Sequence, residues 1–340
     1  MNLDSDHTVG GILKKPLPLA FSALTLALVL PFAPIGCATL AIATAPAKKP
    51  ILDDSAATQA AERAFWAALH GGKYDAIGET LELYQRSYLA NPNAAMSAAR
   101  IGWLHTWRVA ERARLAAAPA TITDDIVLGR RYFGEAVSLA PGESRFLGFS
   151  ASMTMAEGAV HKDQSLSRRG YFQMNEAITA WPEFNLFTAG ISVAGLPAGD
   201  RLFTEGVERQ WENLDVCVDG KVDRSDGRFG AYMTMETHTG RNRACWDSWI
   251  APHNLEGFFL HMGDMLVKSG DVAKATVMYQ NAKLPRNYGT WKLRDVLEDR
   301  LAHASEYVAT FREKNGAGVP DPTKRPFWAS SFTCTGCHQD

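Results

Sequence analysis

The last ten residues of the sequence, SFTCTGCHQD, contain Cys334-Thr335-Gly336-Cys337-His338. Two thiols at this spacing can bond to the vinyl groups of one haem, and the imidazole that follows can bind its iron. A thioredoxin-like dithiol, a disulfide or half of a zinc site would leave His338 unexplained. A zinc site also needs a second ligand pair, and the other cysteines are scattered: Cys37, Cys217 and Cys245. The motif therefore predicts one covalent haem c, held by Cys334 and Cys337, with His338 as the proximal iron ligand.

The sixth position of the iron is left open by the motif. A methionine or histidine there would suit electron transfer, whereas a vacant position would permit ligand binding. One group of candidates is the stretch METH, which contains Met235 and His238. Another is the helix expected to begin near Pro252, on which His261 and Met265 lie four positions apart and face one way. Each candidate taken singly could equally be a packed methionine or a hydrogen-bonded histidine.

The N-terminus has the features of an export signal. Lys14 and Lys15 precede an apolar run, residues 17–30, that is too short to span a membrane securely. We therefore expect residues 1–36 to be a signal peptide. The motif resembles that of the c-type cytochromes, and this resemblance implies haem attachment outside the bacterial cytoplasm.

The apolar run is followed by Pro34-Ile35-Gly36-Cys37, which resembles the lipobox of bacterial lipoproteins, although Pro34 departs from the usual leucine. The resemblance implies that Cys37 is lipidated and anchors the chain to a membrane surface, with the outer membrane favoured. Residues 37–59 would then form a membrane-proximal spacer. Cleavage after a site such as Ala41-Ile42-Ala43 is the alternative, and it would remove Cys37.

Two cysteines flank the segment that is least like a helix. Cys217 and Cys245 lie on either side of VDGKVDRSDGRFG, residues 218–230. In an oxidising compartment we expect them to form a disulfide, which would close a loop of about 27 residues and contribute about 3 kcal/mol. Two separate buried thiols are the alternative. The sequence thus predicts a disulfide-stapled insertion near residues 214–250.

The body of the chain is predicted to be all-α. Its 46% hydrophobic content can supply a core, and a net charge of −2 argues against a nucleic-acid partner. Apolar residues recur at three- and four-residue steps, which is typical of amphipathic helices, and no convincing alternation indicates strands.

One spacing of small, large, small and proline positions recurs along this body. Three copies share the whole spacing: Thr80, Tyr84, Ser87 and Pro92; Gly129, Phe133, Ala136 and Pro141; and Gly170, Met174, Ala177 and Pro182. A fourth copy, Ala275, Tyr279 and Ala282, shares the first three positions and is closed by Pro285. The pattern resembles the tetratricopeptide repeat, in which small residues let two antiparallel helices approach and proline ends the second helix. The resemblance implies an irregular helix-pair solenoid over residues 60–312. An unrelated helical bundle is the alternative.

Residues 313–340 are predicted to form a tether and a haem-bearing tail. The stretch NGAGVPDPTKRP, residues 315–326, is rich in glycine and proline and indicates an extended tether. Phe327, Trp328 and Phe332 follow it, and aromatic side chains favour burial, so the tail should fold back on the helical body. The region between Met233 and His261 is the expected host for the haem.

These features together predict a membrane-anchored monohaem c-type cytochrome in the bacterial periplasm, which passes one electron to or from a redox partner protein. The alternative is a non-redox, tetratricopeptide-like periplasmic lipoprotein that acts as a scaffold or solute-transport accessory, with Cys334 and Cys337 as a disulfide. No acid–base constellation, nucleophile elbow or phosphate loop is visible. Electron transfer or binding is therefore favoured over catalysis.

Overall fold

The computed structural model describes residues 37–246 and 254–339. The chain divides into two compact units, residues 1–47 and residues 48–340. In the first unit the described element is a short helix, α1 (Cys37–Ala43). The expected signal peptide, residues 1–36, lies outside the described residues, as does the side chain of Cys37, on which the lipidation prediction depends. The second unit contains α2 to α14.

The all-α prediction is confirmed for the described part of the chain, where the β-type pairing is an isolated bridge between Ile51 and Ala94. The helices of the second unit are α2 (Ala56–His70), α3 (Ile77–Ala90), α4 (Ala95–Ala110), α5 (Ile122–Leu139), α6 (Ser144–His161), α7 (Gln164–Ala180), α8 (Pro182–Val193), α9 (Arg201–Cys217), α10 (Arg243–Trp246), α11 (Leu255–Ser269), α12 (Val272–Asn281), α13 (Arg294–His303) and α14 (Tyr307–Arg312). Short 3-10 helices include η3 (Gly230–Met235), η4 (Arg286–Thr290), η5 (Lys314–Gly316), η6 (Pro322–Lys324) and η7 (Phe327–Ala329). Within the two described ranges no helix is long and apolar enough to cross a membrane.

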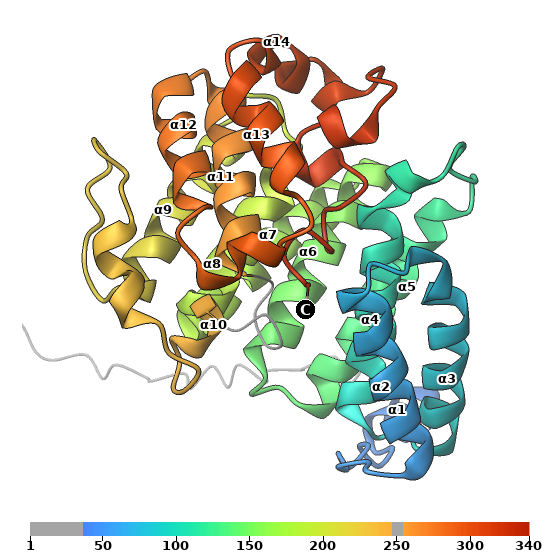
Figure 1. The fold of residues 1–340 in the computed structure, drawn as a ribbon. Coiled ribbons are helices and arrows are strands. Elements are labelled where there is room, and N and C mark those ends of the chain that lie inside the picture. The colour runs from blue at the N-terminus through green and yellow to red at the C-terminus, as the bar shows by residue number, and fades with distance from the viewer. Residues whose placement is uncertain (1–36, 247–253, 340) are drawn as a thin grey trace, which may run out of the picture. The chain divides into compact units, whose positions relative to one another are not determined.

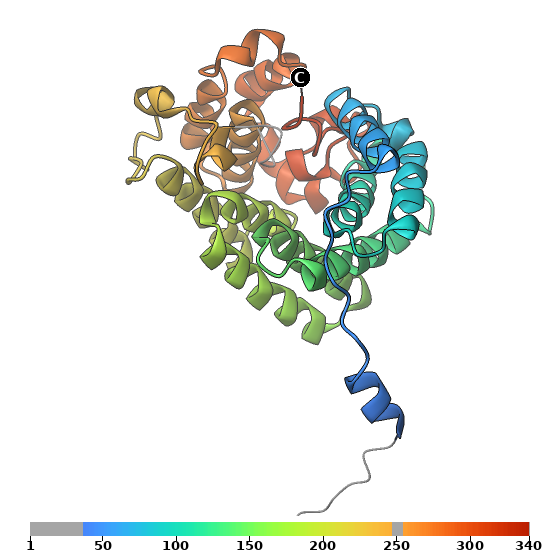
Figure 2. The same ribbon diagram turned by 90° about the horizontal axis from the view of Figure 1, so that it is seen from below.

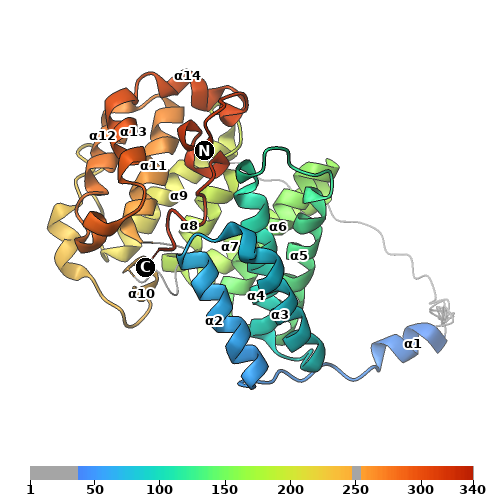
Figure 3. The ribbon, with the colours of Figure 1, turned by 45° about the vertical axis from the view of Figure 1, so that its right-hand side comes forward.

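Consecutive helices of the second unit pack as pairs. The pairs are α2 with α3, α4 with α5, α6 with α7, α8 with α9, and α11 with α12 (Figures 1 and 3). Glycines permit the close approaches: a Cβ atom on Gly102 of α4 would lie 2.9 Å from the ring of Phe133 on α5, and one on Gly263 of α11 would lie 2.2 Å from the ring of Tyr279 on α12. Both aromatic rings occupy the large position of the recurring spacing and are fully buried. The spacing therefore marks residues at helix-pair contacts.

Helix α11 is buried on every side. All residues from Leu255 to Lys268 are buried, which is typical of a helix surrounded by other elements. The side chain of Asn254 caps its first turn by accepting a hydrogen bond from the N–H of Gly257 at 2.9 Å. Gly270 ends it with φ of 99°, a left-handed conformation that glycine adopts without steric cost.

The tail that carries the Cys-x-x-Cys-His motif lies between the first and the last helices of the second unit. Figures 1 and 2 show this red segment between the blue helices that include α2 and the orange helices that include α11 and α12. Cys334 packs against the apolar cluster of α2 to α4, whereas Cys337 belongs to the cluster that contains the buried residues of α11 to α14. The tail therefore contacts both apolar clusters, as the burial of its aromatic residues would require.

The segment expected to be an extended tether is folded onto the body instead. The Asn315 side chain accepts hydrogen bonds from Lys268 Nζ at 2.6 Å and from Trp328 Nε1 at 3.0 Å. Arg300, which is fully buried on α13, donates to the carbonyl oxygen of Arg325 at 2.6 Å. Glycine and proline content predicted a segment without regular structure, but it could not reveal these partners on α11 and α13.

A disulfide joins Cys217 to Cys245, the pair that the sequence analysis had singled out. Helix α9 continues as far as Cys217, so the insertion begins at the end of this helix rather than at residue 214. The bridge connects the end of α9 with α10, and η3 lies between them. The end of the predicted insertion, residues 247–250, lies outside the described residues.

Candidate haem-attachment site

The motif itself forms a single turn. The backbone N–H groups of Cys337 and His338 both donate to the carbonyl oxygen of Cys334, at 3.2 and 3.0 Å. Residues three and four positions apart in such a turn share one face. The backbone turn therefore brings Cys334, Cys337 and His338 close together along the chain.

A buried carboxylate beside α4 holds this turn. Glu111 directly follows α4 and is fully buried. Its Oε1 accepts hydrogen bonds from the N–H groups of Cys334 and Thr335, at 2.9 and 2.8 Å, and from the Thr335 hydroxyl at 2.9 Å. Its Oε2 pairs with Arg114 Nε at 2.7 Å, and Arg114 Nη2 donates to the same hydroxyl at 3.2 Å. The first half of the turn is thereby fixed to the end of α4.

Residues from the last helices hold the other half of the turn. Trp291 Nε1 donates to the carbonyl oxygen of Gly336 at 3.0 Å, and the N–H of Asn254 donates to that of Cys337 at 3.0 Å. The sulfur of Cys337 lies against Gly257 in the first turn of α11, where a Cβ atom would come within 2.5 Å of it. A larger residue at position 257 would displace the thiol.

Both motif thiols are unpaired and shielded from water. Cys337 is buried and Cys334 is half-buried. Burial raises the pKa of both thiols well above its usual value, and the negative charge of Glu111 adds to the effect. A redox-active dithiol needs a lowered thiol pKa, so this environment does not suit thioredoxin-like chemistry.

His261 is a buried histidine with two orphaned ring nitrogens. It is fully buried on α11, and neither ring nitrogen has a hydrogen-bond partner among the described residues. Its ring centroid lies 5.3 Å from that of Phe327, 5.9 Å from that of Trp328 and 5.5 Å from that of Phe187. Burial lowers its pKa to about 3, so the imidazole is neutral near pH 7. Neutral imidazole is the form that binds metals.

The other predicted sixth ligands occupy different surroundings. Met265 is buried in an apolar cluster with Ala194 and Phe203. Met235 is 40% exposed on η3, and His238 forms an ion pair with Glu236 at 3.3 Å. The four candidates therefore do not converge on one point: the tail aromatics contact His261, whereas Met235 and His238 belong to the insertion.

A cavity of about 340 Å³ lies beside the motif. Its lining includes Met233 and His238 from the insertion, and Asn254 and Glu256 from the start of α11. Asn254 is the residue whose N–H donates to Cys337, so the cavity adjoins the motif. Glu256 is buried with an unpartnered Oε1 among the described residues, and burial followed by the charge of Glu236 raises its pKa to about 7. This cavity belongs to the region expected to host the haem.

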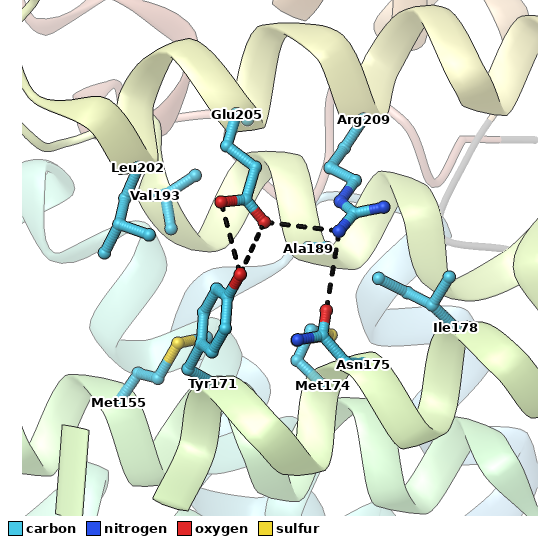
Figure 4. A pocket seen from close by; sticks show the side chains of 11 residues that line it. Met155, Tyr171, Met174, Asn175, Ile178, Ala189, Val193, Leu202, Glu205 and Arg209 are labelled. Carbon is cyan, nitrogen blue, oxygen red and sulfur yellow. Dashed lines mark hydrogen bonds and ion pairs between the residues drawn. The ribbon is translucent and has the colours of Figure 1, made fainter. Parts of the chain in front are cut away.

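A second pocket lies between α6, α7, α8 and α9 (Figure 4). Its polar groups satisfy one another: Tyr171 donates to Glu205 at 3.0 Å, and Arg209 donates to Asn175 at 3.5 Å and to Glu205 at 3.2 Å. Its volume is about 20 Å³, which is room for about one water molecule. The pocket is therefore no candidate for a cofactor.

Sequence reasoning missed Glu111, Trp291 and Gly257 as parts of the site. Glu111 carried a faint signal, because an acidic residue at the C-terminal end of a helix opposes the helix dipole. No sequence signal marked Trp291 or Gly257 as part of the site, since a buried tryptophan or a helical glycine is ordinarily explained by packing.

Across residues 37–246 and 254–339, no group of three or more His, Cys, Asp and Glu side chains is arranged to hold a metal ion. Comparisons with protein-family models, with curated proteins and with solved structures found no match to this chain.

Proposed function

We propose that this protein is a membrane-anchored, monohaem c-type cytochrome that transfers single electrons in the bacterial periplasm. The observation that supports the proposal is the single backbone turn that contains Cys334, Cys337 and His338 and that is hydrogen-bonded to Glu111 on one side and to Trp291 on the other. A haem attached there would supply one-electron redox chemistry through its iron.

The residues present fit this cofactor. Cys334 and Cys337 would hold it through thioether bonds, and His338 would bind the iron. His261 is favoured as the sixth ligand, because its buried and unpartnered nitrogens need a partner and because it packs against the tail aromatic Phe327. Met265, Met235 and His238 remain lesser candidates for the same position.

The residue that follows the thiols favours haem over the non-redox alternative. A disulfide between Cys334 and Cys337, as in a periplasmic scaffold lipoprotein, would give His338 no role, whereas haem attachment uses all three residues.

The helical body would serve as the docking platform for a redox partner protein. Five pairs of neighbouring helices, and the burial of Tyr84, Phe133, Met174 and Tyr279 at equivalent positions, support an irregular tetratricopeptide-like solenoid that is interrupted by the insertion between α9 and α11. The disulfide between Cys217 and Cys245 is consistent with an oxidising compartment. Export by a signal peptide at residues 1–36, and a lipid anchor on Cys37, complete the proposal.

Intact mass and visible spectra of the full chain, made with a haem-attachment system, test the proposal. The mass should exceed that of the mature polypeptide, including any lipid, by one haem, and ferric and ferrous spectra should differ. The double variant Cys334→Ser with Cys337→Ser should lack the added mass. A wild-type chain with no added haem would refute the cytochrome. Carbon monoxide binding that increases in His261→Leu, and not in Met265→Leu, would support His261 as the sixth ligand.

A further inference from the structure

Glu111 occupies a position that is costly for a carboxylate. It follows the last residue of α4, where the helix dipole places partial negative charge. It is also fully buried, and a buried charge is tolerated only when it is paired and hydrogen-bonded. A carboxylate at this place therefore needs hydrogen-bond donors that stabilise its charge.

Most of the donors to Glu111 belong to the tail. Cys334 and Thr335 donate three hydrogen bonds to the Glu111 carboxylate. Among the described residues, its other side-chain partner is Arg114, which forms an ion pair with it. Two successive backbone N–H groups and a hydroxyl thus converge on one carboxylate oxygen. Such charge-assisted bonds are stronger than those between neutral groups. The Trp291 and Asn254 contacts on the other half of the turn are single neutral hydrogen bonds.

The bonds to Glu111 determine how the motif is presented. The peptide N–H of Cys334 is held by Glu111, and the carbonyl oxygen of the same residue accepts the N–H groups of Cys337 and His338. Fixing residue 334 therefore fixes the turn that carries the second thiol and the imidazole. Without the carboxylate, the turn would keep its internal bonds but lose its charged attachment to α4.

We infer that Glu111 is a positioning residue for the haem, which orients the attachment turn so that the iron can reach a sixth ligand on the body. This role rests on the proposed function, because it assigns a task to Glu111 in the same haem site. The carboxylate acts through the backbone of Cys334 and Thr335.

The test compares full-length haem-loaded protein with the variants Glu111→Ala and Glu111→Gln. A matched control is Glu157→Gln, because Glu157 is also buried and paired with an arginine, Arg130, but joins α6 to α5 rather than the tail to α4. Haem content by mass, carbon monoxide binding, midpoint potential and hydrogen exchange of the C-terminal peptide are measured for each.

In Glu111→Ala we expect unchanged haem content, because the thiols remain, but amide exchange in the C-terminal peptide that is faster by about tenfold or more. We also expect more carbon monoxide binding and an altered midpoint potential. Glu111→Gln keeps one acceptor oxygen, so its exchange rate, carbon monoxide binding and midpoint potential should lie between those of wild type and Glu111→Ala. Glu157→Gln should match wild type in all four measurements, even if its thermal stability falls. A Glu111→Ala protein that matches Glu157→Gln in exchange, carbon monoxide binding and potential would overturn the inference.

Thr335→Val provides a milder variant in case Glu111→Ala does not fold. It removes one of the three tail bonds to Glu111 and leaves both thiols, the imidazole and the carboxylate in place. Its C-terminal peptide should exchange faster than wild type by a smaller factor, with a smaller rise in carbon monoxide binding, and no change in either would contradict the role of Glu111.

The same exchange measurement on Cys334→Ser with Cys337→Ser separates the two proposals. A wild-type chain that carries no haem would reject the cytochrome, whereas unchanged tail exchange on removal of the Glu111 carboxylate in this double-serine background would reject the attachment of the turn by Glu111.

Discussion

Two buried carboxylates fasten the tail to the body, and they differ in what satisfies them. Asp264 on α11 accepts hydrogen bonds from the Tyr279 hydroxyl at 2.7 Å and from Arg300 Nε at 3.0 Å, both in the body, and from the tail N–H of Phe327 at 2.8 Å. Glu111 accepts three hydrogen bonds from the tail, and one body residue, Arg114, pairs with it. Phe327, at the beginning of the tail, thus adds one hydrogen bond to a carboxylate that groups of the body already bind. The motif turn, in contrast, supplies most of the hydrogen bonds that stabilise the buried carboxylate of Glu111.

The comparison predicts two levels of stability in one segment. Amide groups near Phe327 should exchange with solvent only when the whole helical body unfolds. The motif turn should open locally at a lower free energy, because its neutral contacts and Glu111 can be lost while the helix pairs remain.

Removal of Asp264 should have the largest effect. Asp264→Ala leaves Arg300, whose side chain is fully buried, without its buried partner, and should lower the free energy of unfolding by about 3–5 kcal/mol. Urea denaturation followed by circular dichroism measures this loss. Asp299→Ala is the control, because Asp299 contacts Arg300 at 3.4 Å but is partly exposed, and should cost about 0–1 kcal/mol. Equal losses in the two variants would show that Asp264 is not the main anchor.

Removal of the disulfide should have the second-largest effect. It should lower the free energy of unfolding of the whole protein without selectively accelerating amide exchange in the tail. Cys217→Ala with Cys245→Ala opens the loop between α9 and α10 and should cost about 2–4 kcal/mol in urea denaturation. Alanine is chosen because both sulfurs are buried. Exchange of the C-terminal peptide, measured well below the unfolding transition, should stay at the wild-type rate. Selective acceleration there would link the insertion to the motif turn.

Glu256 offers a third buried carboxylate for the comparison, one with an unpartnered oxygen. Since its pKa is raised to about 7, the folded protein keeps the proton that the unfolded chain releases near pH 4.5, and stability falls as pH rises between these values. Glu256→Gln should therefore be more stable than wild type by about 3 kcal/mol near pH 8 and equal to it near pH 4. Denaturation at both pH values tests this, and a variant less stable at pH 8 would mean that the carboxylate is paired.

His261 should show the smallest effect, and its sign should depend on haem. In the haem-free background Cys334→Ser with Cys337→Ser, His261→Leu should stabilise the protein by about 1 kcal/mol near pH 7, because it removes two unpartnered buried nitrogens. The gain should grow as pH falls below about 6.5, since the unfolded chain then protonates a histidine that the fold keeps neutral. If the protein binds haem as proposed, the same change should remove the proposed sixth ligand. A destabilised haem-free variant would indicate that His261 has a structural partner.

The helices were predictable because their signals are local. Apolar spacing marked the helical body, and the small and large positions around Phe133 and Tyr279 coincide with contacts between paired helices. The order of the pairs as a solenoid remains a proposal. Glycine and proline also correctly indicated a segment without long helices before the motif, but not its contacts with Lys268 and Arg300.

The surroundings of the motif were not predictable, because their partners are distant in sequence. Cys334 and Glu111 are separated by 223 residues, and no periodicity connects an acidic residue after one helix with two amide groups in the tail. The candidates His261 and Met265 were grouped because they share a helix face in sequence. Packing separates their environments, since Phe327 and Trp328 lie against His261 whereas Met265 joins the cluster of Phe203.

The long sequence separation between the tail and α4 has a consequence for the order of maturation. Contacts between Glu111 and the motif close one of the largest loops in the chain, so they should form after the helix pairs, whose contacts are local. Until then both thiols are open to reagents, and afterwards Cys337 is buried. Under the proposed function, the folding delay sets a time window, and haem must be attached to the thiols before the tail closes over them.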